Sequence, residues 1–212
     1  MKYIEILQKD PVMAGLIEKH GELTLGKGYM VMSENTQVES GQIASELFCD
    51  LAAAIVGQLL SVKAASTIEK RVVDLCGGRL CAEKIVEFSD DELRAVGLSY
   101  GKARCIKVLA KAFLDKTLDL ENLHKIPDEE IITTLSSLKG IGRWTAEMFL
   151  LFSLGREDIF SHGDQGLKNA ISKLYGSGTP LTKTEIDAII ANWKPYRSYA
   201  SLYLWRSLDN AN

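Results

Sequence analysis

The sequence predicts an all-α protein, because helical periodicity dominates it and helix start and stop signals flank the periodic stretches. Apolar residues recur three and four positions apart, as on one face of a helix, within residues 48–60, 103–113 and 131–138. We expect the first of these stripes to be core, and it contains Phe48, Leu51, Ala52, Ile55, Val56, Leu59 and Leu60.

The start and stop signals fall in order along the chain. Ser89 precedes Glu92, and Thr182 precedes Glu185, at the spacing of a capping box. Pro127 with the acidic residues that follow it suits a helix N-terminus. Glycines interrupt the apolar runs and predict helix ends at residues 77–78, 97, 155 and 176–178.

Residues 24–37 alone lack this pattern, and residues 29–32 could form a short extended piece. The composition is that of an ordinary globular protein, with 46% hydrophobic and 25% charged residues among 212. A formal net charge of −3 gives no global attraction to nucleic acid, so a DNA-binding face has to be a local basic patch. No stretch approaches eighteen uninterrupted apolar residues, which predicts a soluble intracellular protein without membrane contact.

The cysteines and histidines are scattered. Cys49, Cys76, Cys81 and Cys105 include no pair at CxxC spacing, so we expect reduced core thiols and no iron–sulfur cluster. The three histidines are too far apart in sequence to predict a metal site.

Residues 138–164 contain the pattern with the clearest chemistry. Gly140 and Gly142 flank Ile141 in a turn that calls for positive φ or a close backbone approach, and an apolar helix follows. Backbone amides at such a turn can hold a phosphate. The alternative is a plain helix–helix turn, in which Lys139 and Arg143 are a solvated helix end. Asp164 follows behind a loop.

The longer string Leu138–Ala146 resembles the helix-hairpin-helix of the DNA glycosylase superfamily, and three further blocks resemble its 3-methyladenine DNA glycosylase II branch. These are Gly57–Ala65, Gly97–Ser99 with Lys102–Arg104, and Trp193–Ala200. Together the four blocks span about residues 47–205, in family order.

The resemblance implies two helical subdomains flanking a DNA- and base-binding cleft, which the hairpin and the catalytic carboxylate would line. One subdomain would be a helical barrel over 47–156, with the hairpin near 131–153. The other would be a bundle made of 1–46 and 157–212. The stretch before residue 47 is too short for the N-terminal β domain of larger relatives, so we expect a compact form.

The resemblance also implies a monofunctional glycosylase that excises 3-methyladenine, and also 7-methylguanine, from duplex DNA in base excision repair, without a cofactor. Asp164 would stabilise the positive charge that builds on the sugar. Many relatives carry a second Asp just before it, but here that residue is Gly163, so Asp164 would act alone. Its alternative role is an N-cap for the next helix, and both roles can hold together.

The base pocket implied by the resemblance contains Trp144, Met148 and Trp205. Trp144 stands where bifunctional relatives carry a nucleophilic lysine, and indole cannot form a Schiff base. Lys139 and Lys168 are nearby lysines that could still supply an amine. Trp205 would stack on a cationic base, or else it is a core tryptophan. Met148 replaces an aromatic found in several relatives, which leaves base preference open.

The DNA contacts implied by the resemblance fall into two groups. Leu59, with Gln58 beside it, would be the wedge that fills the hole left by the flipped base, unless Leu59 continues the core stripe. The backbone contacts would be made by Lys139, Gly140, Ile141, Gly142, Arg143 and Thr145. A monovalent cation at the hairpin carbonyls is a further implication.

The expected partner is double-stranded DNA containing alkylated bases, bound by a monomer located in the cytoplasm of a prokaryote or the nucleus of a eukaryote. Two alternatives stay open: a non-catalytic binder of damaged or bent DNA, and a glycosylase for a different lesion, such as a mismatch or an oxidised base.

Overall fold

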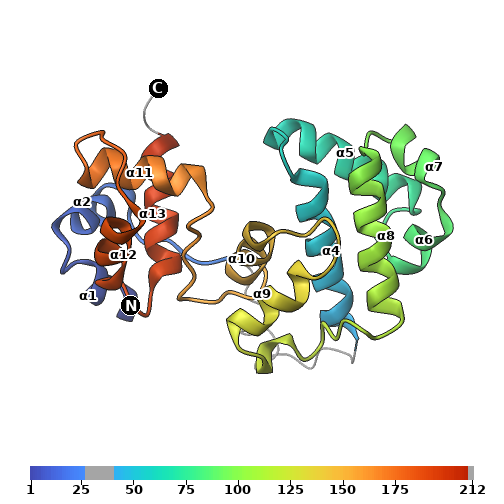
Figure 1. Ribbon diagram of the computed structural model, residues 1–212, viewed down its shortest axis with the longest axis horizontal. Helices are drawn as coiled ribbons and strands as arrows, with labels where there is room; N and C mark the ends of the chain where they lie inside the picture. The colour runs from blue at the N-terminus through green and yellow to red at the C-terminus, as the bar shows by residue number, and fades with distance from the viewer. Residues whose placement is uncertain (27–40, 210–212) are drawn as a thin grey trace. The chain divides into compact units, whose positions relative to one another are not determined.

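The computed structural model describes residues 1–26 and 41–209 and is all-α in this part of the chain (Figure 1). No strand occurs among these residues, which confirms the predicted fold class. The extended piece predicted at residues 29–32 lies outside the described residues. No helix in the described ranges is long and apolar enough to cross a membrane.

Two compact units make up the chain. The larger unit comprises residues 29–149, and the smaller unit combines residues 1–28 with 150–212. The predicted division had its boundaries at 46/47 and 156/157. The second boundary of the structure falls inside a helix, α10 (Arg143–Phe152).

The larger unit is built around one buried helix, α4 (Gln42–Gly57), which contacts α5 and α8 (Figure 1). α6 and α7 pack on α8 in turn. In chain order after α4 come α5 (Val62–Leu75), α6 (Ala82–Glu87), α7 (Asp90–Ala95), α8 (Tyr100–Leu114), a short 3₁₀ turn (Leu123–Lys125) and α9 (Asp128–Ser136).

The predicted core stripe of α4 is correct only as far as Val56. Phe48, Leu51, Ala52, Ile55 and Val56 are buried, but α4 ends at Gly57 and the two leucines beyond it leave the helical register. Leu59 is 105% exposed and Leu60 is 39% exposed. The core interpretation of Leu59 is therefore wrong, because periodicity was continued past a glycine that ends the helix.

The smaller unit joins both ends of the described chain in one core. Its helices are α1 (Lys2–Leu7), α2 (Pro11–His20), α11 (Gln165–Tyr175), α12 (Lys183–Ala191) and α13 (Arg197–Asp209). Trp193 is fully buried, and its indole N–H donates to Asp10 at 3.0 Å. The same carboxylate accepts the Tyr175 hydroxyl at 2.8 Å and caps α2, so Asp10 fastens α2 to the C-terminal helices.

The helix start signals in the sequence are confirmed in both units. Ser89 with Glu92 and Thr182 with Glu185 form capping boxes, and α9 begins directly after Pro127, all as predicted. The prediction of core thiols is correct for Cys105 alone: of the four free thiols only this one is buried, and burial raises its pKa to about 11.

Candidate active site and DNA-binding hairpin

The helix-hairpin-helix consists of α9, a turn and α10, and Gly140 shapes the turn. Its φ is 103°, and an added Cβ would lie 2.7 Å from the Cys105 sulfur on α8. Only glycine fits there. Gly142 is different, because its φ is not positive and an added Cβ would meet nothing within 4 Å. The predicted positive φ and close approach are both present at Gly140, while Gly142 shows neither within the protein.

The hairpin turn is exposed on both sides of Ile141. Ile141 is buried and anchors the turn, while Lys139 and Gly142 are exposed. The N–H of Ala146 donates to the carbonyl of Gly142 at 3.1 Å, so α10 begins immediately after the turn. The first N–H groups of a helix have no acceptor within it, and they point toward any anion beyond the helix start.

The Arg143 side chain is bound within the hairpin itself. Its guanidinium donates two hydrogen bonds to Glu129, at 3.0 and 2.6 Å, and one to the buried Glu147 at 2.8 Å. Hydrogen bonding from Arg143 lowers the pKa of the Glu129 carboxyl. The guanidinium thus ties α9 to α10 while the side chain stays 57% exposed, and its contact with the DNA backbone stays a prediction.

Gln58 links the end of α4 to the hairpin. Its side-chain N–H group donates to the Gly140 carbonyl at 3.3 Å and to the Thr145 hydroxyl at 3.1 Å. Thr145 is buried, so its side chain supports the hairpin from inside rather than facing solvent. The two turns predicted to contact DNA are therefore braced against each other within the larger unit.

Leu59 follows Gln58 and projects into solvent from a left-handed backbone with φ 57°. Lys102, on α8, holds this segment from behind: its ammonium donates to the carbonyls of Val56 and Gln58 at 2.8 and 2.6 Å. Burial lowers the pKa of Lys102. Leu59, Lys102 and Lys139 also line one groove of about 650 Å³ in the larger unit. Sequence reasoning missed the role of Lys102, although the residue lies in a block that resembles the family.

Asp164 in the smaller unit is 8% exposed and precedes α11 as its N-cap. One carboxylate oxygen, Oδ1, accepts the backbone N–H of Leu167 at 2.8 Å and the indole N–H of Trp205 at 3.0 Å. The N-cap alternative is thus correct. The same two bonds fix the orientation of the carboxylate.

Trp205 is half-buried and packs at the edge of the smaller unit's core, and its ring lies against both Asp164 and the exposed Phe152. The Phe152 and Trp205 rings stack with centroids 5.7 Å apart and planes at 26°. Gly166 keeps this corner open, since an added Cβ would lie 3.1 Å from the Asp164 oxygen and 3.2 Å from the indole. Phe152 and Gly166 were not predicted. Gly166 could have been noticed in the sequence, because glycine is unfavourable in a helix and this one lies in the first turn of α11.

Trp144 and Met148 lie one turn apart on α10, on the same face of that helix. Trp144 is 42% exposed, while Met148 is buried at 8%. Their assignment to a base pocket stays a prediction.

Comparison with known proteins identifies the class. A family model described as the HhH-GPD superfamily of base excision DNA repair proteins matches residues 52–195. The chain therefore belongs to that superfamily. It is 35% identical to a DNA-3-methyladenine glycosylase of Saccharomyces cerevisiae, covering 95% of this chain and 77% of the yeast protein. Relatives of this name set it in the type II branch of the superfamily.

Solved structures agree. The crystal structure of a DNA-3-methyladenine glycosidase from Bacillus halodurans is 36% identical, with a TM-score of 0.79 over 97% of this chain and 88% of that one. The Schizosaccharomyces pombe 3-methyladenine DNA glycosylase in complex with abasic DNA is 27% identical, with a TM-score of 0.81 over 100% and 98%. The chain spans about half the length of other curated relatives, 56% for one from Bacillus subtilis and 54% for one from Escherichia coli.

No group of three or more metal-ligating side chains of histidine, cysteine, aspartate or glutamate lies within residues 1–26 and 41–209.

Proposed function

We propose that this protein is a monofunctional DNA glycosylase that removes alkylated purines, 3-methyladenine and 7-methylguanine, from duplex DNA by base flipping and hydrolysis. The observation that carries the proposal is the Asp164 carboxylate, buried, oriented by two N–H donors and adjacent to a stacked aromatic pair. Membership of the repair superfamily supports a DNA substrate, and the relatives named DNA-3-methyladenine glycosylase support the choice of lesion.

One carboxylate is enough for this chemistry. Breaking an N-glycosidic bond leaves positive charge on the sugar, and a fixed carboxylate stabilises that charge. An N3- or N7-alkylated purine already carries a formal positive charge, so it leaves as a neutral base without a general acid. The hydrogen bonds from Leu167 and Trp205 hold Asp164 in place, so little reorganisation accompanies the reaction.

Recognition of the base and of the duplex would use aromatic and backbone groups. The Trp205 ring, stacked on Phe152, offers a π face that attracts an electron-poor base by roughly 1–2 kcal/mol when desolvated. The hairpin amides would bind phosphates without reading sequence. Leu59, exposed on its braced turn, would enter the stack in place of the flipped base.

The hairpin carbonyls are suitable donors for a monovalent cation, because such ions take backbone carbonyl oxygens as ligands. The Gly140 and Gly142 carbonyls each accept one hydrogen bond and retain a second lone pair. A cation there would supply positive charge next to a DNA phosphate. We further propose that the protein acts as a monomer, in the compartment that holds the chromosome.

The test is release of free base from duplex DNA treated with a methylating agent, followed by mass spectrometry. Wild-type protein should release 3-methyladenine, and Asp164→Asn should be at least about a hundredfold slower, comparable to losing one transition-state electrostatic contact. Asparagine keeps an oxygen for both N–H donors and is as good an N-cap as aspartate, so this variant should remain folded. Wild-type turnover by Asp164→Asn would rule out the catalytic assignment.

Borohydride trapping tests the monofunctional part. Because the indole of Trp144 cannot form a Schiff base, no covalent protein–DNA adduct should be trapped during turnover. A covalent adduct trapped with wild type and absent with Lys139→Ala or Lys168→Ala would contradict the monofunctional assignment.

A further inference from the structure

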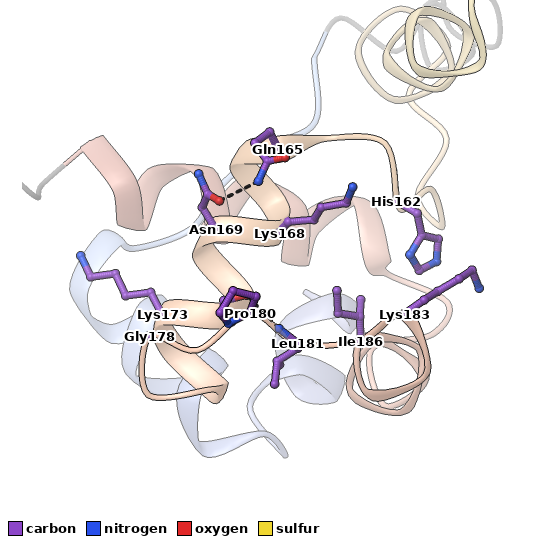
Figure 2. Close-up of a pocket in the computed structure, with 11 residues that line it drawn as sticks. His162, Gln165, Lys168, Asn169, Lys173, Gly178, Pro180, Leu181, Lys183 and Ile186 are labelled. Carbon is purple, nitrogen blue, oxygen red and sulfur yellow. Dashed lines mark hydrogen bonds between the residues drawn. The ribbon is translucent and has the colours of Figure 1, made fainter.

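The smaller unit has a basic cavity of about 610 Å³ beside α11, α12 and the loop between them (Figure 2). Three lysines, a histidine and polar uncharged side chains contribute to its lining, and none of the described lining residues is acidic. Gln165, the residue directly after Asp164, is among its lining residues.

Lys168 is the distinctive cation of this cavity. It is the fourth residue of α11, where the positive end of the helix dipole disfavours an ammonium group. It is half-buried, and it forms no ion pair with any residue in the described ranges. A partly desolvated cation in such a place is stabilised when an anion binds.

Neighbouring groups face the same space. Figure 2 shows the Lys168 side chain extending toward the side of the cavity where the His162 ring and Lys183 lie. Asp187 fixes both of these, contacting the His162 ring at 3.0 Å and the Lys183 ammonium at 2.6 Å. The Asp187 carboxylate thus pairs with His162 and Lys183 and not with Lys168.

Two carboxamides continue the same face of α11. Gln165 donates to Asn169 at 2.8 Å, one turn further along, and in Figure 2 Gln165 lies above Lys168 and Asn169 to its left. Side-chain N–H groups of this kind add donors for the oxygens of an oxyanion.

We propose that this cavity binds a backbone phosphate of the DNA, with Lys168 as its principal contact. The inference rests on the proposed function, because that function brings a nucleotide to Asp164. Phosphates follow one another about every 3.4 Å along the axis of one strand. Lys168 lies four residues beyond Asp164, about 6 Å along the helix. A neighbouring phosphate of the same strand is thus within its reach, and the smaller unit holds the strand independently of the hairpin.

The test is the salt dependence of binding to a short duplex that carries a stable abasic-site analogue, measured by fluorescence anisotropy. Lys168→Gln should weaken binding about fivefold at low salt, the size of one partly exposed ion pair. It should also reduce the slope of log K against log salt by about 0.9. Lys168→Arg should restore the slope. Lys19→Gln, which removes an exposed lysine of α2 outside this cavity, is the control with the same charge change and should match wild type.

A Lys168→Gln slope equal to that of wild type, with a melting curve showing a folded protein, would overturn the inference. A second result would also overturn it: millimolar inorganic phosphate stabilises wild type but not Lys168→Gln, and the two proteins bind DNA equally well. The cavity would then hold a free phosphate ion. Binding is scored separately from base release. A wild type that releases no base while Lys168→Gln still lowers the slope would contradict the proposed function and leave this inference standing.

Discussion

Replacing Leu59 by glycine should make the protein more stable and a poorer glycosylase. The leucine has φ 57° and is 105% exposed, so it makes no packing contribution to lose. An L-residue in the left-handed region costs roughly 1–2 kcal/mol. Glycine removes that strain but costs about 0.4–1 kcal/mol of stability, because it raises the conformational entropy of the unfolded chain. The net gain is about 0.5–1 kcal/mol, or about 1–4 °C in melting temperature at this chain length.

The expected effect on activity has the opposite sign. Filling the gap in the base stack with a leucine side chain buries apolar surface that contributes about 1.5–3 kcal/mol. Its loss should lower kcat/KM for base release by roughly ten- to a hundredfold. Thermal melts and base-release kinetics on the same preparations measure both quantities.

Leu60→Gly is the matched control. Leu60 is 39% exposed and has no positive φ, so glycine there removes packing and adds unfolded-state entropy, and the melting temperature should fall. The reasoning would be refuted if Leu59→Gly melted below wild type as Leu60→Gly does, or if it excised bases at the wild-type rate.

Two further substitutions test the supports of the hairpin. Lys102→Met removes a charged donor from two carbonyls at the end of α4, so it should lower the free energy of unfolding by about 1.5–3 kcal/mol and weaken DNA binding. Its control is Lys107→Met, which removes a surface ion pair on the same helix and should cost less than about 1 kcal/mol; chemical denaturation measures both. Gly140→Ala should lower the free energy of unfolding by about 1–3 kcal/mol and reduce affinity for duplex DNA, because the added methyl group meets Cys105 and the backbone φ is positive. A Gly140→Ala variant as stable as Gly142→Ala would show that the turn is less constrained than its geometry indicates.

The helices and their limits were predictable because they depend on neighbours in sequence. The two capping boxes, the start at Pro127 and the end of α11 at Gly176 involve groups within four residues of one another. At Leu59 the periodic stripe predicts core and the preceding Gly57 predicts a helix end, and the structure agrees with the glycine.

The candidate site was only partly predictable because its supports join distant segments. Asp164 as a cap follows from its place before α11, but the indole of Trp205 that holds the same oxygen comes from another helix. Lys102 reaches a carbonyl 46 residues away, at Val56. A lysine in a sequence motif gives no sign that its partners are backbone oxygens rather than phosphates.

The double use of Asp164 limits how this position can change over evolutionary time. A descendant that gave up base excision but still bound damaged duplexes would need a side-chain oxygen at 164 to begin α11 and to receive the indole. Asparagine meets both needs, and serine or threonine meets the first. Descendants that have lost base excision should therefore carry one of these polar residues at position 164 instead of an arbitrary one. The residue at this single position would then distinguish active from inactive proteins that share the same fold.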